Sequence, residues 1–144
     1  MTTTRRSFLA VVAAGSAATC LAGLPGCATP LSGTYSAGNI ADLAEGGTLP
    51  VDGAPLVVMR DATGVWAMTT ICTHLDCDML QQGSVTASAL VCDCHASTFT
   101  PDGDVVSGPA NQPLDNFAVT IDAEGAITID ADTPVDAGTR TPVV

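Results

Sequence analysis

Two short boxes hold four of the six cysteines and both histidines of this 144-residue chain, and no other feature constrains the fold as strongly. The first box reads C-T-H-L-D-C over residues 72–77, and the second reads C-D-C-H-A-S over residues 92–97. Two histidines placed at random would rarely each fall within three residues of a cysteine pair. Thiolates and imidazoles are the protein ligands of zinc and of iron–sulfur clusters. The two boxes therefore predict one metal centre held by two loops.

The two boxes resemble those of the Rieske iron–sulfur proteins, which read C-T-H-L-G-C and C-P-C-H-G-S. In that family the first cysteine and the histidine of each box bind a 2Fe–2S cluster, with the cysteines on one iron and the histidines on the other. The resemblance extends over roughly residues 36–130. Carried over to this sequence, it implies four cluster ligands: Cys72, His74, Cys92 and His95.

The same resemblance implies roles for residues near the ligands. The other two box cysteines, Cys77 and Cys94, would form a disulfide that ties the two ligand loops together. Ser97 would donate a hydrogen bond to a bridging sulfide of the cluster, whereas Phe99 stands where many high-potential members have a tyrosine. The Gly108–Pro109 pair begins a segment, residues 108–114, that resembles the family's Pro-containing loop over the cluster. An ordinary surface turn is the alternative for this segment.

Three box positions depart from the family pattern. Asp76 and Ala96 replace glycines, and Asp93 replaces a proline. Ligands two or three residues apart can converge on one cluster only if the backbone turns sharply between them. Aspartate adopts the left-handed conformation of such turns fairly well, and alanine does so less readily. We therefore expect a tight turn in each box, with more strain in the second.

A zinc site built from two cysteines and two histidines is the alternative metal centre. Zinc accepts this donor set. Its usual signature, however, places a Cys-x-x-Cys pair before two spaced histidines. A Cys-x-His box followed by a Cys-x-x-His box matches that signature poorly, and the sequence favours the iron–sulfur cluster.

The pattern of apolar residues predicts an all-β fold, and the resemblance implies Rieske-like antiparallel sheets with a small cluster-binding subdomain formed by two loops. Two β-rich runs, 56–59 and 65–70, flank a turn signal and lead into the first box. Short runs at 89–91 and 97–100 enter and leave the second box. The clearest period-two alternation is a final hairpin with its turn at 122–125. No segment after residue 27 has a convincing helical stripe.

The N-terminal residues 1–27 are expected to be an export signal. Arg5 and Arg6 lie in the motif T-R-R-S-F-L, which resembles a twin-arginine signal, and a short, interrupted apolar stretch follows. An uncleaved N-terminal anchor helix is the alternative. The residues L-P-G-C at 24–27 resemble a lipobox, in which Cys27 would carry a lipid. These patterns place the protein outside the cytoplasm, in the periplasm or an equivalent compartment, associated with a membrane.

Composition divides the rest of the chain into three expected parts. Residues 28–38 are rich in Thr, Pro, Ser and Gly and are predicted to be a linker. Residues 39–131 would form the Rieske 2Fe–2S domain. Residues 132–144 are rich in Pro, Thr and Asp and are expected to be a loose tail.

The charge balance argues against nucleic acid as a partner. The chain has 15 acidic residues, four arginines and no lysine, which gives a formal net charge of −11. An acidic surface can steer a basic redox partner, although a solvated surface that keeps the protein soluble is the favoured explanation.

We predict an exported, membrane-tethered protein that transfers one electron at a time through a Rieske-type 2Fe–2S cluster. Its partners would be redox proteins, either a cytochrome or a membrane oxidoreductase, and quinol would be reached through a partner subunit. The alternative is the iron–sulfur subunit of a larger respiratory enzyme, of the cytochrome bc or arsenite-oxidase type. A ring-hydroxylating ferredoxin fits less well, because such proteins lack the second cysteine pair. A zinc-stabilised binding module is the non-redox alternative.

Overall fold

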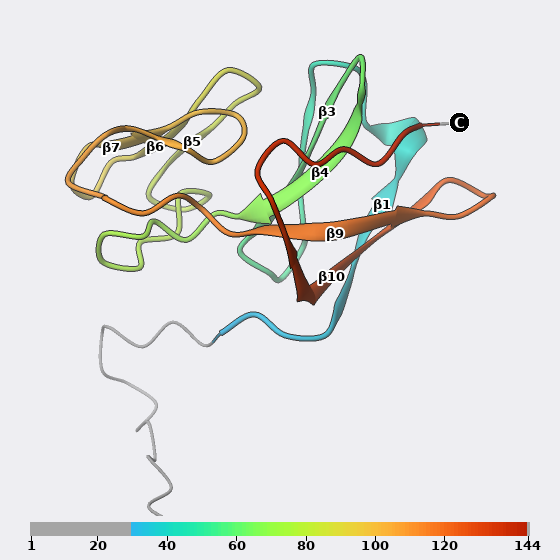
Figure 1. Ribbon diagram of the computed structural model, residues 1–144, viewed down its shortest axis with the longest axis horizontal. Helices are drawn as coiled ribbons and strands as arrows, with labels where there is room; N and C mark the ends of the chain where they lie inside the picture. Colours follow the sequence, from blue (N-terminus) through green and yellow to red (C-terminus); the bar gives the residue numbers. More distant parts are fainter. Residues whose placement is uncertain (1–29, 144) are drawn as a thin grey trace, which may run out of the picture.

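The computed structural model describes residues 30–143, which form two antiparallel sheets (Figure 1). The larger sheet has the strand order β1-β10-β9-β4-β3-β2, and the smaller has the order β5-β6-β7-β8. Between residues 30 and 143 the only helical element is the 3-10 turn η1 (Ile40–Asp42), and no helix there could span a membrane. The predicted export and lipidation residues Arg5, Arg6 and Cys27 lie outside the described residues.

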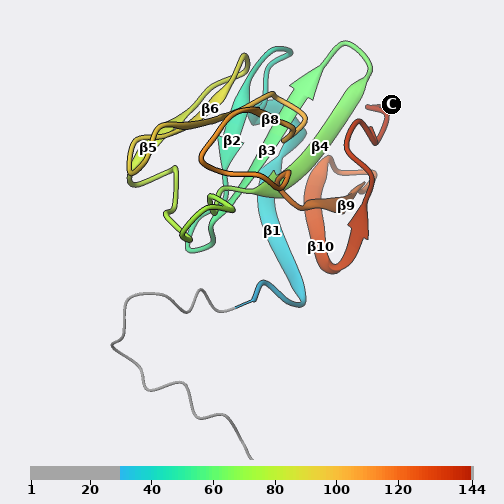
Figure 2. The same cartoon turned by 60° about the vertical axis from the view of Figure 1, so that its left-hand side comes forward.

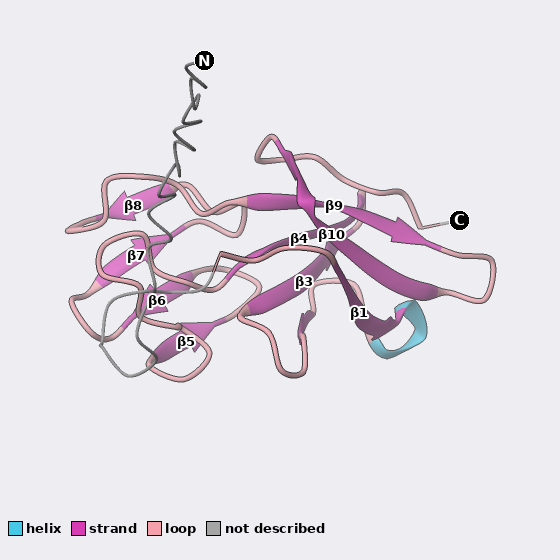
Figure 3. Cartoon of the chain, turned by 90° about the horizontal axis from the view of Figure 1, so that it is seen from below, coloured by secondary structure: helices cyan, strands magenta, loops and turns pink. Residues whose placement is uncertain are grey.

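The larger sheet consists of β1 (Thr34–Asn39), β2 (Thr48–Pro50), β3 (Leu56–Asp61), β4 (Gly64–Thr69), β9 (Asn116–Ile121) and β10 (Ala126–Val135). The smaller sheet consists of β5 (Gly83–Val85), β6 (Leu90–Cys92), β7 (Ser97–Phe99) and β8 (Val105–Ser107). The smaller sheet is inserted between β4 and β9, and it lies beyond one end of these strands (Figure 3). Turning the molecule shows β5 and β6 on one side of β2–β4, with β9 and β10 on the other (Figure 2).

The hairpin β3–β4 separates two hydrophobic cores. Alternate side chains point to opposite faces of a strand, so Val58 and Ala67 contribute to the core of the larger sheet. Their neighbours Met59 and Trp66 contribute to a second core, which extends under the smaller sheet. Burial on both faces explains why the sequence of this hairpin is a continuous apolar run rather than an alternating one.

The predicted linker and tail differ from the structure at their inner ends. Strand β1 begins within the expected linker and pairs with β10, with Thr34 opposite Asp130. Only Ala37 is buried in this edge strand, so backbone hydrogen bonds to β10 hold β1 in place more than apolar side chains do. The composition of residues 28–38 therefore gave no sign of the strand. In the tail, β10 continues to Val135, and the backbone of Thr141 makes two hydrogen bonds with Val65, of 2.8 and 2.9 Å. The described part of the tail is therefore not loose.

Candidate metal centre

The two boxes form turns of the same geometry. The first box follows β4, and the second joins β6 to β7. In each box the fifth residue donates its backbone N–H to the carbonyl of the first cysteine: Asp76 to Cys72 at 3.0 Å, and Ala96 to Cys92 at 2.8 Å. Asp76 and Ala96 also have left-handed φ angles of 58° and 64°. The expected tight turns are therefore present at both positions where this sequence lacks the family's glycine.

The predicted ligands meet as two pairs. Cys72 and Cys92 are buried and are not in a disulfide, and their thiols are neighbours. The rings of His74 and His95 face each other edge to face, with centroids 4.7 Å apart. Burial raises the pKa of the Cys92 thiol, and the neighbouring Cys72 raises it further. Burial and the neighbouring thiol therefore both disfavour an uncompensated thiolate at Cys92.

One histidine nitrogen supports a metal or cluster at this place. His74 Nδ1 is buried and has no hydrogen-bond partner. Leaving such an atom unsatisfied costs about 1–3 kcal/mol, so native structures rarely do so without a reason. A ligand nitrogen aimed at an iron is such a reason, and the donor set of two thiols and two imidazoles fits a Rieske-type 2Fe–2S cluster.

The remaining box cysteines form the predicted disulfide. Cys77 and Cys94 are bonded, with their Cα atoms 6.7 Å apart and a sequence separation of 17. The sulfur of Cys92 lies within 4.8 Å of both, but bonded sulfurs are not thiolate ligands, so these three cysteines do not form a second metal site. The disulfide joins the two ligand loops directly.

The Pro-containing segment packs against both boxes. Ser97 Oγ accepts a hydrogen bond from the Ala110 N–H at 3.0 Å, and Thr73 Oγ1 donates to the Gln112 carbonyl at 2.7 Å. Ser97 is fully buried, and its own hydroxyl proton has no acceptor within residues 30–143. It can therefore donate to a cluster sulfide. The Thr73 contact was not predicted from the sequence, because its partner lies 39 residues away.

Two further contacts shape the ligand loops. Asp78 Oδ1 accepts from the Thr70 hydroxyl at 2.7 Å and from the Leu80 N–H at 3.0 Å, which fixes the chain leaving the first box. The Asp93 N–H donates to the Gln82 carbonyl at 3.0 Å, a bond that the family's proline could not make. The only local sequence signal for the Asp78 contacts is the aspartate itself, a residue type whose side chain often accepts from the N–H two residues further on, here that of Leu80.

The comparison with known families decides between a cluster and zinc. The model of the Rieske [2Fe-2S] domain matches residues 33–118 of the chain. The chain belongs to the Rieske [2Fe-2S] domain family. The all-β Rieske fold, the 2Fe–2S cofactor and electron transfer through the cluster follow from this membership and from the relatives below.

Curated relatives of this Rieske domain include iron–sulfur subunits of cytochrome b6-f complexes. The subunit of Chlorobaculum tepidum is 34% identical over 74 residues, which is 51% of this chain and 39% of that protein. The chloroplastic subunit of Bigelowiella natans is 34% identical over 100 residues, which is 68% of this chain and 38% of that protein. The chain thus spans less than half the length of these curated relatives.

Solved structures show the same fold. The plasma membrane Rieske protein PetC3 of Synechocystis PCC 6803 is 25% identical, with a TM-score of 0.51 over 67% of this chain and 98% of that one. The ferredoxin of carbazole 1,9a-dioxygenase from Nocardioides aromaticivorans is 22% identical, with a TM-score of 0.50 over 69% of this chain and 98% of that one.

Proposed function

We propose that this Rieske domain is an exported one-electron carrier, tethered to a membrane, with its cluster held by Cys72, His74, Cys92 and His95. The observation that carries this proposal is the orphaned, buried Nδ1 of His74, whose ring faces that of His95. The thiols of Cys72 and Cys92 are buried and outside any disulfide. When bound, the 2Fe–2S cluster supplies the one-electron redox couple.

The protein would present its histidine side to partners and shield its cysteine side. Cys72 and Cys92 are buried in the second core, with 1% and 0% of their surface exposed. His95 is exposed and His74 is half-buried, and Leu75 beside it is 62% exposed. Electrons would therefore enter and leave past the two imidazoles. The disulfide and the Thr73 and Ser97 hydrogen bonds would keep the loops rigid during transfer.

Ligand assignment is tested by metal content and colour. The wild-type protein should hold two irons and two acid-labile sulfides per chain, and His74→Ala or His95→Ala should abolish its visible absorption. Glu45→Gln, an exposed substitution far from the boxes in sequence, is the matched control. A histidine variant with the wild-type spectrum and iron content would remove that histidine from the ligand set.

Export and tethering are supported by the sequence of the first 27 residues. If Cys27 is the lipid-bearing residue of the mature protein, Cys27→Ser should release the domain from membranes or leave it unprocessed. Mass spectrometry of the mature N-terminus is the measurement. A membrane-bound protein that still begins before Arg5 and Arg6 would favour an anchor helix instead.

The second candidate is a subunit of a larger respiratory oxidoreductase. The cytochrome b6-f subunits among the relatives favour it. Under this alternative the partner would be a membrane oxidoreductase that binds quinol, whereas a free carrier would exchange electrons with a cytochrome. Purification from native membranes separates the two, because a quinol-binding or molybdenum-containing subunit would accompany only the complex.

A further inference from the structure

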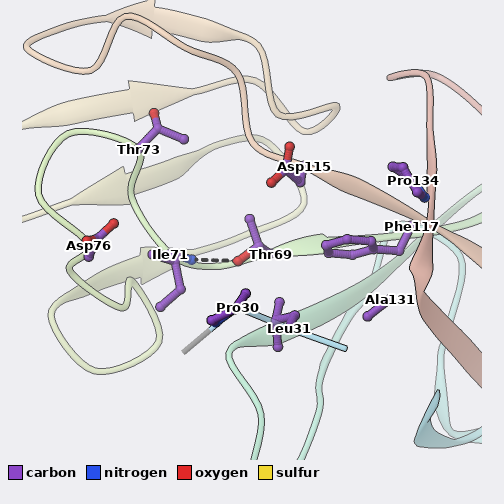
Figure 4. A pocket seen from close by; sticks show the side chains of 10 residues that line it. All are labelled: Pro30, Leu31, Thr69, Ile71, Thr73, Asp76, Asp115, Phe117, Ala131 and Pro134. Carbon is purple, nitrogen blue, oxygen red and sulfur yellow. Dashed lines mark hydrogen bonds between the residues drawn. The ribbon is translucent and has the colours of Figure 1, made fainter. Parts of the chain in front are cut away.

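A cavity of about 460 Å³ opens beside the first ligand loop (Figure 4). Its apolar lining includes Leu31, Phe117 and Ala131, from the chain before β1 and from β9 and β10. Thr73 and Asp76, from the first box, line it on another side. We call this cavity the side pocket. Anything bound in it touches the same loop that carries His74.

The side pocket has two carboxylates that the protein leaves unpaired. Asp76 comes from the first box, and Asp115 directly precedes β9. Both are exposed, and neither carboxylate makes a hydrogen bond or an ion pair with any residue from 30 to 143. By contrast, the carboxylates of Asp61, Asp78 and Asp122 all accept hydrogen bonds from their own neighbourhood.

No arginine in the described part of the chain is available to neutralise these carboxylates. Arg60 donates to the Leu43 carbonyl at 2.8 Å, and Arg140 forms ion pairs with Asp61 and Asp102. Residues 30–143 contain all 15 acidic side chains and only these two arginines, which gives a net charge of −13. The field of the domain therefore attracts cations, and the side pocket offers them apolar contact as well.

We propose that the side pocket docks a basic redox protein, which inserts an apolar side chain flanked by Lys or Arg. This inference rests on the proposed role as an electron carrier. An apolar anchor in a pocket supplies most of the binding energy of such a contact, and the flanking cations pair with Asp76 and Asp115. The partner's redox centre then lies beside the first ligand loop. A second copy of the chain is a poor occupant, because two domains of charge −13 repel each other.

The test uses the full-length, cluster-loaded protein and two oxidants. A basic c-type cytochrome is the probe for docking, and ferricyanide is the probe for the electron-carrier function itself. In the first reaction the reduced protein gives one electron to ferric haem, which becomes ferrous, and the protein is left oxidised. Stopped-flow absorbance of the ferrous haem gives the bimolecular rate, which is measured from low to high ionic strength.

Three variants probe the side pocket against one control. Asp115→Asn and Asp76→Asn each remove one carboxylate. Asparagine is chosen at position 76 because it also tolerates the left-handed conformation there. Leu31→Ser weakens the apolar lining. Glu45→Gln removes the same charge from an exposed residue that makes no side-chain hydrogen bond and does not line the side pocket. Voltammetry of Asp76→Asn corrects its rate for any change in driving force, because this residue lies near the cluster.

At low salt we expect each Asp variant to react with the cytochrome about threefold more slowly than Glu45→Gln, with the difference disappearing at high salt. Leu31→Ser should be slower at every salt concentration. Asp115→Asn and Glu45→Gln, which each remove one negative charge, should react with ferricyanide at the same rate as each other, and Leu31→Ser should react with it at the wild-type rate. Equal slowing by Asp115→Asn and Glu45→Gln would overturn the docking site, since only total charge would then matter.

Other occupants give different results, each of which would also overturn the proposal. A dimer that Leu31→Ser dissociates in sedimentation experiments would assign the side pocket to a second copy. Faster reaction with the cytochrome after removal of residues 1–27 would assign it to the chain's own N-terminal segment. Failure of the wild-type protein to pass an electron to ferricyanide would instead refute the electron-carrier function, whatever the variants do.

Discussion

Ala96 adopts a left-handed conformation at φ 64° that favours glycine. A Cβ atom in this conformation costs about 1–2 kcal/mol, whereas the greater freedom of glycine in the unfolded chain costs about 0.5–1 kcal/mol. Ala96→Gly should therefore raise the free energy of unfolding by about 0.5–1 kcal/mol. Thermal unfolding of the loaded protein is the measurement. Ala87→Gly is the control and should lower stability, because Ala87 is exposed and has no positive φ.

Phe99 is fully buried in the same core as Cys72 and Cys92. A tyrosine hydroxyl at this position could donate to a ligand thiolate and stabilise the reduced, more negative cluster. If about 1 kcal/mol of such a bond differs between the redox states, Phe99→Tyr should raise the reduction potential by about 40 mV. Ser97→Ala should lower it, because the Ser97 proton is free to reach a sulfide.

Voltammetry measures both shifts. Phe117→Tyr is the matched control, because it adds the same hydroxyl to the other core of the protein. A Phe99→Tyr protein with an intact cluster and an unchanged potential would mean that residue 99 only fills space in the core.

The sequence alone leads to the proposed ligand set because each box is local. Cys72 and His74, like Cys92 and His95, are separated by only one or two residues, and the box itself dictates the turn. Hydrogen bonds between segments far apart in the sequence were not predictable in this way. Thr73 bonds to Gln112, and Arg140 bonds to Asp61 from 79 residues away, and no sequence period links such pairs.

The Cys77–Cys94 disulfide joins the loop after β4 to the loop between β6 and β7. A crosslink closing a loop of 17 residues contributes about 3 kcal/mol by the chain-entropy estimate. Cys77→Ser and Cys94→Ser should each lower the free energy of unfolding by about this amount and reduce cluster loading. The double variant should be no worse than either single one, because both remove the same bond. Thiol counting on the unfolded, unreduced, iron-free protein gives an independent check: two additional free thiols would contradict the bond.

Strands were predictable where side chains alternate or are buried on both faces. The hairpins β3–β4 and β9–β10 have such patterns, and the structure confirms both. Strands β1, β2 and β5 contain few buried side chains, and backbone pairing with a neighbour defines them. A sequence reveals apolar burial more readily than backbone pairing, which explains these omissions.

At the scale of the whole molecule, Arg140 connects three parts of the chain. Its guanidinium forms ion pairs with Asp61 at the end of β3, at 3.1 Å, and with Asp102 in the turn after β7. It also stacks 3.5 Å from the centre of the Trp66 ring, and Trp66 Nε1 donates to the Pro101 carbonyl. One tail residue thus joins the larger sheet to the smaller one, on which the second ligand box lies.

Removing this side chain should loosen the attachment between the sheets. The cation–π contact and two partly exposed ion pairs contribute about 1–2 kcal/mol together. Arg140→Leu should lower the free energy of unfolding by that amount and speed the loss of the cluster on heating. Arg60→Leu is a suitable comparison, since the Arg60 side chain bonds only to the carbonyl of Leu43, between η1 and β2, and does not reach the smaller sheet.

The same connection should be sensitive to acid. Partial burial alone would raise the pKa of Asp61, but hydrogen bonds from Thr63 and Arg140 and the Arg140 charge outweigh it and lower the pKa from 3.8 to about 2. A carboxylate with a depressed pKa in the folded state stabilises the protein above its unfolded pKa, and this contribution is lost as pH falls from about 4 to about 2. Asp61→Asn should remove that part of the pH dependence.

The fluorescence of Trp66, the chain's single tryptophan, reports on this connection directly because Arg140 stacks on it. Between pH 5 and pH 2 the wild-type protein should lose more stability than Asp61→Asn, whereas Asp104→Asn should follow the wild type. Acid also attacks the cluster, but that loss is common to all three proteins and cancels in the comparison. Identical acid curves for the wild type and Asp61→Asn would mean that the Arg140–Asp61 pair does not couple the tail to the sheets.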